Sequence, residues 1–328
     1  MRILISDQPD SMMPDHELEI RTLTDGLGPD TDIEVYPYDP EHPEGFLERL
    51  STADALLTAF IPLDANTLRA AKQLKFISLN STGFDLVDLD AAQELGIGVC
   101  AVGEYCTADV SEGAIAFIFA LNKHVKSYGR AIDIDHAWDY AAAPAWPRTQ
   151  EQVLGIVGFG KIGQCTARKM SNLVKGVVAC DPYLPPDIAK DLGVELVRKE
   201  ELLERSDIIV NHMAQTDSNR NYFDADAFSR MRRHPILINM ARGTAIDESA
   251  LVDALDTGVV RGYAADVLAD EHPDLAHHPL VGRNDVLLTP HSSFYSASSL
   301  EDLERISAQN IVDYLCGHKD KVFRMVTP

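Results

Sequence analysis

The chain has 328 residues, of which 45% are hydrophobic and 24% charged, so it is long enough and apolar enough for two ordinary globular domains. Its 51 acidic and 29 basic residues give a formal net charge of −22, which argues against nucleic acid as a partner because phosphate binding needs basic surfaces. No run of 18 apolar residues occurs, so the sequence predicts no membrane span.

The acidic composition and the cysteines bear on the habitat and the cellular location of the protein. Solubility is the simpler interpretation of the negative charge, and a salt-rich habitat is the alternative. The opening stretch MRILISDQPD is typical of a strand and lacks the long apolar segment of a signal peptide. Five scattered cysteines without metal-ligand spacing favour reduced thiols and a cytoplasmic location: Cys100, Cys106, Cys165, Cys180 and Cys316.

The first third of the chain alternates strand-like and helix-like segments. Short apolar runs at 1–6, 31–37, 53–60, 74–80 and 96–102 predict strands, and residues 62–74 and 89–96 predict helices between them. Residues 107–134 follow, with apolar residues that run almost continuously before becoming amphipathic. We expect this stretch to form one long, partly buried connecting helix.

A second series of strand-like runs occupies 153–160, 176–183, 206–213, 235–241, 261–269 and 285–291, again separated by helical segments. Alternation of this kind is typical of parallel sheets covered by helices. Two such series predict an α/β fold with two doubly wound parallel-sheet domains.

The most specific motif is VLGIVGFGKIGQCTARKM, in which an apolar strand runs into Gly158, Gly160 and Gly163 and a helix follows. Such glycines permit a tight turn, close approach to a pyrophosphate and close packing of helix on strand. Asp181 ends the next strand-like run, where a carboxylate would accept hydrogen bonds from the adenosine ribose. Because a 2′-phosphate would be repelled there and PYLPPD offers no basic residue, NAD is predicted over NADP.

Three side chains with the chemistry for hydride transfer follow three successive strand-like runs of the second series. Arg242 has a fork of donors for a carboxylate or a polarised carbonyl, and His291, in LLTPHSSFYS, can donate a proton near neutral pH. A carboxylate at Glu271 would stabilise the protonated imidazole. Since ligands of open α/β sheets lie at the carboxyl ends of the strands, these residues together predict reduction of a 2-keto acid.

The motifs GFGKIG with Asp181, INMARGTAIDESALVDAL, GYAADVLADE and LLTPHSSF resemble those of the D-isomer-specific 2-hydroxyacid dehydrogenases over nearly the whole chain, with D-lactate and D-2-hydroxyisocaproate dehydrogenases the most similar branch. The resemblance implies that Arg242, Glu271 and His291 are catalytic, that Asp266 contacts the nicotinamide amide, and that the protein is a homodimer. The cofactor-binding residues predicted with it are Gly158, Gly160, Lys161, Ile162, Gly163, Asp181, His212, Met213, Ala214, Thr216, Met240, Ala241 and Asp266.

The same resemblance implies a discontinuous domain arrangement. A flavodoxin-like substrate-binding domain is expected from residues 1–102 and 292–328, with a Rossmann NAD-binding domain and its dimerisation arm inserted as residues 103–291. The loop NSTGFDLVD resembles the family's carboxylate-binding loop, so the backbone N–H groups of Ser81, Thr82 and Gly83 are expected to hold the substrate carboxylate.

Aromatic and apolar residues near the expected substrate suggest its class. The residues predicted to line the side-chain pocket are Phe60, Tyr105 and Phe294, together with Ile61 and Phe84. These segments contain no Arg or Lys, as a phosphorylated substrate would require. The sequence therefore favours a small non-phosphorylated aliphatic or aromatic 2-keto acid, with glyoxylate and hydroxypyruvate as alternatives.

Three departures from the family pattern stand near the site. His272 intervenes before Pro273, Ala214 replaces a usual proline and Met240 a usual small or β-branched residue. The first affects how Glu271 is presented, so Asp270 is the alternative carboxylate. A non-enzymatic alternative also remains, namely an NAD-sensing corepressor that binds other proteins and keeps the same three residues. No metal site is predicted.

Overall fold

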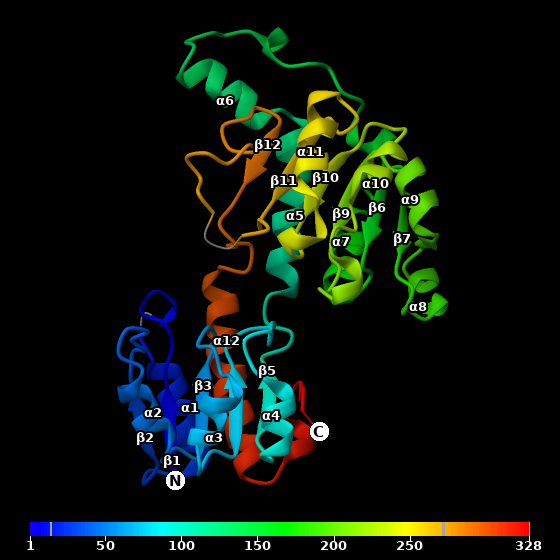
Figure 1. Cartoon of the computed structure of the whole chain (residues 1–328). Helices are drawn as coiled ribbons and strands as arrows, with labels where there is room; N and C mark the ends of the chain where they lie inside the picture. The colour runs from blue at the N-terminus through cyan, green and yellow to red at the C-terminus, as the bar shows by residue number, and fades with distance from the viewer. Residues whose placement is uncertain (14, 271–272, 328) are drawn as a thin grey trace. The chain divides into compact units, whose positions relative to one another are not determined.

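The computed structural model describes residues 1–13, 15–270 and 273–327. The chain divides into two compact units (Figure 1). Unit 1 comprises Met1–Tyr105 and Ser296–Pro328, and unit 2 comprises Cys106–Tyr295. Both division points lie a few residues C-terminal to the domain junctions suggested by the sequence.

Unit 1 is built on a five-stranded parallel sheet in the order β2-β1-β3-β4-β5, which is the flavodoxin-like order. Its central strands consist of buried apolar residues because helices cover both faces. All five predicted strands are present: β1 Arg2–Ile5, β2 Asp32–Val35, β3 Ala55–Thr58, β4 Phe76–Leu79 and β5 Gly98–Ala101.

The helices of unit 1 form two layers, each with its own core. Leu23 of α1 and Ala308 of α12 pack in a core on one face of the sheet. Phe46 of α2, Leu68 of α3 and Ala92 of α4 pack in the core of the other face. The helices span α1 Glu17–Leu27, α2 Glu44–Leu50, α3 Ala65–Ala70, α4 Leu89–Glu94 and α12 Ala297–Leu315.

Unit 2 has a seven-stranded parallel sheet in the order β12-β11-β10-β9-β6-β7-β8, a doubly wound order that reverses between β6 and β9. Six strands were predicted, and β8 was missed because two residues are too short to show an alternating pattern. The strands span β6 Val153–Val157, β7 Gly176–Cys180, β8 Glu195–Leu196, β9 Ile208–Asn211, β10 Ile236–Asn239, β11 Gly262–Ala265 and β12 Val286–Leu288. The predicted fold class, two parallel α/β domains, is confirmed.

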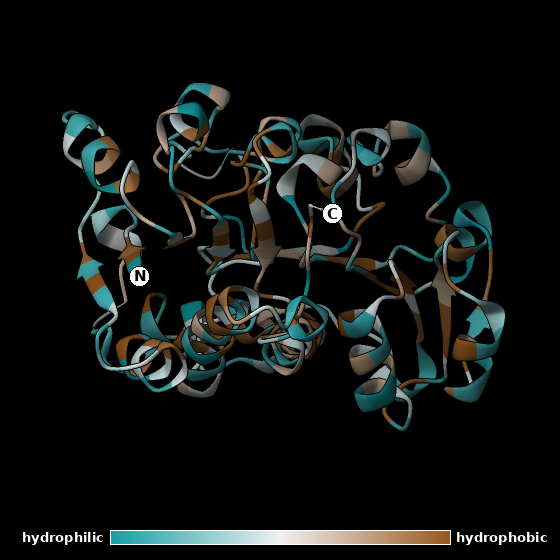
Figure 2. Ribbon diagram, turned by 90° about the horizontal axis from the view of Figure 1, so that it is seen from below, coloured by the Kyte–Doolittle hydropathy of each residue, from teal (hydrophilic) through white to brown (hydrophobic). Residues whose placement is uncertain are grey.

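Helices cover both faces of this sheet too. Helices α5 Thr107–Asn122, α7 Lys161–Met170 and α8 Pro186–Asp191 contribute to the core on one face. Helices α9 Lys199–Arg205, α10 Ala225–Ser229 and α11 Glu248–Asp256 contribute to the other. In Figure 2 the strands are mostly brown, and many teal residues lie on the outer faces of helices. The reactive residues therefore have to lie at the strand ends, where loops leave this packed core.

The prediction of one long helix over 107–134 is wrong. Helix α5 ends at Asn122 and a separate helix, α6, spans Val125–Asp133. Between them His124 has a φ of 52°, in the left-handed region that helices of L-residues avoid. The chain turns at this residue, and α6 leads into the segment 134–148 at the top of Figure 1, which contains a short 3-10 helix at Tyr140–Ala142. Within the described residues, no helix has the length and apolar character needed to cross a membrane.

Candidate active site

Close packing requires two of the three glycines that follow β6, and the third borders open space. Gly158 has a φ of 84°, and a Cβ there would lie 2.6 Å from the backbone nitrogen of Met213. A Cβ on Gly163 would lie 2.4 Å from the carbonyl oxygen of Gly158. At Gly160 a Cβ would meet nothing within 4 Å, so this glycine faces open space. The loop thus packs tightly on one side and leaves the other side accessible to a ligand.

Helix α7 begins at Lys161, directly after Gly160, and no side chain caps its first turn. Lys161 and Ile162 occupy the first two helical positions, and neither the glycine loop nor the first turn carries an acidic side chain. An uncapped helix N-terminus beside an open glycine is suited to a pyrophosphate, because its N–H groups and partial positive charge face the anion. The residues present therefore fit a dinucleotide.

Asp181 follows β7, the strand next to β6. Its Oδ2 accepts a hydrogen bond from the backbone N–H of Phe159 (2.8 Å), and its Oδ1 accepts one from that of Tyr183 (3.0 Å). These contacts fix the carboxylate beside the glycine loop. Each oxygen has a further lone pair, so the group can still accept from ribose hydroxyls.

The loop after β9 lies against the same glycines. The carbonyl carbon of His212 is 2.7 Å from a Cβ placed on Gly158, so this backbone forms the wall of the turn. The His212 Nε2 lies 3.0 Å from the Oγ1 of Thr166, and burial lowers the pKa of His212 to about 3, so the ring is neutral at pH 7. Asn219 orders the rest of the loop by donating to the carbonyl of Ala214 and accepting from the N–H of Thr216.

Strand β10 ends in a hydrogen-bonded turn that presents Arg242. The Asn239 side chain donates to the carbonyl of Arg242 (3.0 Å) and accepts from the N–H of Ala241 (3.2 Å). Met240 and Ala241 are buried in this turn, whereas Arg242 is half-buried. A Cβ on Gly243 would lie 1.9 Å from the carbonyl carbon of Leu268, so only glycine lets this turn approach the segment after β11.

Asp266, at the end of β11, holds the loop that follows β12. Its side chain is 4% exposed, and its Oδ1 accepts from the hydroxyl of Thr289 (2.5 Å) and the N–H of Ser292 (2.9 Å). Its Oδ2 accepts from the N–H of Ser293 (2.9 Å), and its carbonyl accepts from the N–H of His291 (2.7 Å). The buried carboxylate therefore organises the loop on both sides of His291.

His291 itself is exposed and has a φ of 51°. Its ring lies 6.3 Å from that of Phe294, edge to face. On the inner side of the loop, a Cβ on Gly113 of α5 would lie 2.7 Å from the Oγ of Ser293, so the loop also packs closely on this helix. Glu271, the predicted carboxylate partner, lies outside the described residues, as does His272; Asp270 is described and exposed.

The structure thus brings three predicted groups to neighbouring strand ends of unit 2. Arg242 follows β10, Asp266 follows β11 and His291 follows β12, and these strands are adjacent in the sheet. Burial of the Asp266 carboxylate, and its role in the His291 loop, were not anticipated from the sequence. The motif DVLADE marked the residue, but it could not reveal which groups would donate to it.

In unit 1 the loop after β4 offers three adjacent backbone donors. Among the described residues, nothing accepts a hydrogen bond from the N–H of Ser81, Thr82 or Gly83. The Ser81 hydroxyl bridges to the carbonyl of Gly83 (2.6 Å), and the Thr82 hydroxyl lies 3.5 Å from the carbonyl of Gly103. Successive N–H groups of this kind form a concave site for an anion.

The candidate pocket residues of unit 1 differ in their surroundings. Phe60 is half exposed, whereas Ile61 is 1% exposed and belongs to the core, so Ile61 is not a pocket residue. Phe84 packs partly on that core, and Tyr105 is half-buried. The guanidinium carbon of Arg324 lies 5.9 Å from the centre of the Phe84 ring. This basic group was not expected from the sequence, because Arg324 is 240 positions from Phe84.

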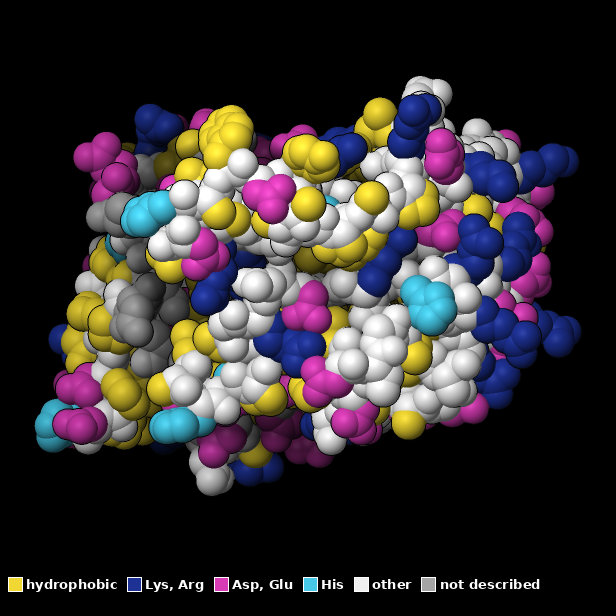
Figure 3. All heavy atoms as spheres, turned by 90° about the horizontal axis from the view of Figure 1, so that it is seen from above, with side chains coloured by type: hydrophobic (Ala, Val, Ile, Leu, Met, Phe, Trp, Pro, Cys, Tyr) yellow, Lys and Arg dark blue, Asp and Glu magenta, His cyan; other side chains and the backbone are white. Residues whose placement is uncertain are grey.

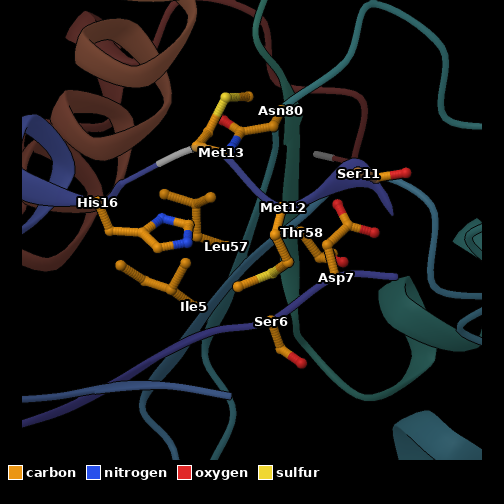
Figure 4. Close-up of a pocket in the computed structure, with 10 residues that line it drawn as sticks. All are labelled: Ile5, Ser6, Asp7, Ser11, Met12, Met13, His16, Leu57, Thr58 and Asn80. Atoms are coloured by element: carbon orange, nitrogen blue, oxygen red, sulfur yellow. The ribbon is translucent and has the colours of Figure 1, made fainter. Parts of the chain in front are cut away.

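A small cavity of about 10 Å³ lies at the same edge of the unit 1 sheet (Figure 4). Asp7, after β1, lines it and accepts from the N–H groups of Ala59 (2.6 Å) and Phe60 (2.9 Å), so this carboxylate positions the Phe60 loop. His16 also lines the cavity, and its Nδ1 contacts the fully buried carboxylate of Glu19. The cavity is about the size of one water molecule and is too small for a 2-keto acid.

Comparison with known protein families gives one extended match. Residues 115–293 match the family described as "D-isomer specific 2-hydroxyacid dehydrogenase, NAD binding domain". The matched segment runs from α5 to the His291 loop and so contains the glycine loop, Asp181, Arg242, Asp266 and His291.

Similar proteins include a D-3-phosphoglycerate dehydrogenase of Mycobacterium tuberculosis, 32% identical over 298 residues. That match covers 88% of this chain and 54% of the relative, so the chain spans about half the length of that protein. A glycerate dehydrogenase of Methylorubrum extorquens is 30% identical over 289 residues, covering 85% of this chain and 88% of the relative. The crystal structure of D-lactate dehydrogenase from Aquifex aeolicus, complexed with NAD and lactic acid, matches with a TM-score of 0.83 and 25% identity, with 99% of each chain covered.

Proposed function

The chain belongs to the D-isomer specific 2-hydroxyacid dehydrogenase family, and we propose that it is an NAD-dependent reductase of small, non-phosphorylated 2-keto acids. The observation that carries this proposal is the arrangement at three adjacent strand ends of unit 2. There, a buried Asp266 holds the loop of His291, and Arg242 follows the neighbouring strand.

NAD is the cofactor of the domain that the chain contains. The open glycine loop and the uncapped start of α7 would hold its pyrophosphate, and the carboxylate of Asp181 would accept hydrogen bonds from the adenosine ribose. When bound, the reduced cofactor supplies a hydride to the keto carbon. We assign the loops at His212–Thr216 and Met240–Ala241 to the walls of this site, because the first lies against Gly158 and the second follows β10, the strand next to β9.

Two side chains of unit 2 would act on the keto acid. His291 donates a proton to the oxygen of the keto group as this oxygen gains negative charge. Arg242 donates hydrogen bonds to the substrate carboxylate and keto oxygen and so stabilises the developing charge. We assign Asp266 a positioning role, because both of its carboxylate oxygens accept from the loop that carries His291.

The protonated form of His291 needs a carboxylate partner. Glu271 remains the first candidate for this role and Asp270 the second, as the sequence suggested. A carboxylate beside the ring would stabilise the imidazolium that donates the proton.

The three adjacent N–H groups of Ser81, Thr82 and Gly83 would bind the substrate carboxylate, and Phe60, Tyr105 and Phe294 would contact the substrate side chain. The guanidinium of Arg324 lies over the ring of Phe84. If the substrate carried a second anionic group, we expect Arg324 to bind it. The aromatic character of the remaining side chains favours aliphatic or aromatic substrates.

We further propose a homodimer formed through α6 and the segment 134–148 after it. This part of unit 2 carries apolar side chains that are largely exposed: Ile132 (46%), Ile134 (66%), Trp138 (93%) and Tyr140 (91%). Such a concentration of exposed apolar residues marks an interaction surface. A second copy of the chain would cover it.

The proposed activity is tested by following NADH consumption with a set of 2-keto acids of increasing size. The set comprises glyoxylate, pyruvate, hydroxypyruvate, 4-methyl-2-oxopentanoate, phenylpyruvate and 3-phosphohydroxypyruvate. We expect the highest kcat/KM with the aliphatic or aromatic acids and D-stereochemistry in the product. A protein that binds NADH tightly but reduces none of these acids would contradict the proposal and favour an NAD-sensing corepressor.

Two variants separate substrate specificity from catalysis. Phe294→Ala should keep activity with pyruvate and weaken kcat/KM for phenylpyruvate by roughly 1–3 kcal/mol, because only the larger side chain loses pocket contact. An equal loss with all substrates would show that Phe294 is a packing residue. Arg324→Gln is the matched variant for charge, and it should leave kcat/KM unchanged for substrates with uncharged side chains. Preferential reduction of the phosphorylated acid, lost in Arg324→Gln, would overturn the assigned substrate class.

A further inference from the structure

The connection between β11 and β12 is anchored at two places to one side chain, that of Glu248 in the first turn of α11. The Oε1 of Glu248 accepts a hydrogen bond from the backbone N–H of Ala269 (3.1 Å). Its Oε2 lies 3.4 Å from the Nε2 of His278. The two contacts stand before and after residues 270–271 in the sequence, which are the candidate carboxylate partners of His291.

The second contact has a defined donor, because the orientation of the His278 ring is fixed. The Nδ1 of His278 accepts a hydrogen bond from the backbone N–H of Leu280 (3.3 Å), so the neutral ring carries its proton on Nε2, which faces Glu248. Leu280 is fully buried in a core of unit 2, and the side chain of His278 is largely buried too. The contact with Glu248 therefore ties the connection to the packed interior of unit 2.

The first contact lies beside the turn that carries Arg242. A Cβ on Gly243 would lie 1.9 Å from the carbonyl carbon of Leu268 and 2.2 Å from the backbone nitrogen of Ala269. That nitrogen is the one that donates to Glu248. The peptide between Leu268 and Ala269 is thus held by the Arg242 turn and by the Glu248 carboxylate together. Its position is fixed relative to one of the proposed catalytic groups.

Packing restrains the connection less beyond this peptide. Leu268 is half-buried, whereas Ala269 and Asp270 are exposed. A hydrogen bond from a backbone N–H to a charged carboxylate is stronger than one between neutral groups, and the side chain of Glu248 is largely buried. Where few apolar contacts restrain a segment, such a polar anchor has the larger influence on its path.

We propose that Glu248 and His278 are a positioning pair, which holds the connection between β11 and β12 so that its carboxylate stays close to His291. The inference rests on the proposed reductase function, in which His291 must be protonated to donate. The pair acts through the connection and not on the substrate. If the pair is broken, the carboxylate spends less time beside the ring, and the imidazolium of His291 becomes less stable.

The pH profile of keto-acid reduction tests the pair in the full-length protein. Glu248→Ala removes both contacts, and His278→Ala removes the second. Glu248→Gln removes the negative charge, but its amide oxygen can still accept from the N–H of Ala269. We expect the alkaline limb of kcat to move to lower pH, by about one pH unit in Glu248→Ala and by less in the other two variants, because the imidazolium is lost earlier. The Kd for NADH should be unchanged.

Asp253→Asn is the matched control, because it removes an exposed acid from the same helix, α11. Acidic and basic side chains are interspersed over the face shown in Figure 3, so a single exposed charge is one among many of both signs. Solvent and salt screen such a charge, and its removal should leave the alkaline limb unchanged. A limb that moves equally in Asp253→Asn and Glu248→Ala, or equally in Glu248→Gln and Glu248→Ala, would show that charge acts through space and would overturn the proposal.

Two further measurements separate the ways in which the proposal can fail. Activity lost uniformly at every pH, together with a lower Tm, would show that the pair is only structural and would overturn the proposal. His278→Ala and Glu248→Gln each keep the contact with Ala269, so they decide the test even if Glu248→Ala does not fold.

An unmodified protein that reduces no keto acid would refute the reductase function, and the pair is then tested without turnover. The NMR titration of His291, identified by the loss of its signal in His291→Ala, should still move to lower pH in His278→Ala and Glu248→Gln. An unmoved titration would overturn the positioning pair.

Discussion

At the carboxyl edge of each sheet, a buried aspartate accepts hydrogen bonds from a neighbouring loop and fixes the position of that loop. We call such an aspartate a brace. In unit 1, Asp7 accepts from the N–H groups of Gln8, Ala59 and Phe60. In unit 2, Asp266 accepts from the hydroxyl of Thr289 and from the N–H groups of two serines beside His291.

The two edges differ in the charges around these aspartates. Burial raises the pKa of Asp7, and the fully buried carboxylate of Glu19 adds to the rise. Burial, with Glu19 and Asp15, also raises the pKa of Glu304 to about 7. The unit 1 edge is therefore crowded with acids and sensitive to pH, whereas the Asp266 brace presents a histidine. Hydrogen-bond donors alone do not set the behaviour of a buried carboxylate, because neighbouring charges also contribute.

The largest expected effect comes from the group that the Asp266 brace presents. His291→Ala should lower kcat for keto-acid reduction by about 10²–10⁴-fold or more, because general acid catalysis and charge stabilisation are both lost. NADH binding, measured by fluorescence titration, should stay nearly intact, because the glycine loop and Asp181 are unchanged. Near-normal turnover by this variant would remove the proposed mechanism.

The Asp266 brace itself is tested by Asp266→Asn, which keeps the shape but turns an amide NH₂ towards an N–H donor. Loss of one buried acceptor is worth about 1–3 kcal/mol, so we expect kcat to fall roughly 5- to 150-fold while the Kd for NADH changes little. A selective rise in the Kd for NADH would instead support direct contact between Asp266 and the nicotinamide amide.

Asp7→Asn is the matched variant in unit 1 and sharpens the comparison. It should affect the Phe60 loop, so the KM for the keto acid should rise more than kcat falls. Thermal melting of both variants shows whether each keeps its fold. If Asp7→Asn and Asp266→Asn lowered kcat alike with unchanged KM values, the two braces would have no separate roles.

A smaller effect is expected at Asp181, which should determine the preference for NADH over NADPH. Catalytic efficiency with NADH should exceed that with NADPH by more than about tenfold, because the carboxylate would repel a 2′-phosphate. Asp181→Ser combined with Tyr183→Arg should narrow this ratio, since Tyr183 is exposed two positions after Asp181. Equal use of both cofactors by the unmodified protein would refute the role of Asp181.

The smallest effect concerns the neighbouring acids at the carboxyl edge of unit 1, Asp7, Glu19 and Glu304. The pKa of Glu304 is raised from 4.5 to about 7, so the folded state binds more protons than the unfolded state between these values. Stability should therefore rise as the pH falls from about 7 towards 4.5. Glu304→Gln should flatten this part of the Tm profile and raise Tm modestly at pH values above 7. Glu94→Gln, which removes an exposed acid of α4 that does not contribute to the raised pKa of Glu304, is the control and should leave the profile unchanged.

Much of unit 2 could be predicted from the sequence, because its signals are local. The strand before Gly158, the spacing of Gly160 and Gly163 and the aspartate after the next strand all lie within about 30 residues. The strand ends at Arg242, Asp266 and His291 could be placed at one edge because parallel strands end together. Two alternating series of strands and helices were likewise enough to predict two parallel α/β domains, a prediction that the structure confirms.

The remaining features depend on contacts between distant residues, which periodicity does not report. Tertiary packing made Ile61 a core residue, placed Arg324 over Phe84 and gave Asp266 its donors from the loop after β12. It also broke the expected long helix at His124, whose ring packs on Trp146. Local sequence thus determined which elements form and which chemistry stands at their ends. The fold alone decided which charges are buried together, because desolvation depends on neighbours that come from other parts of the chain.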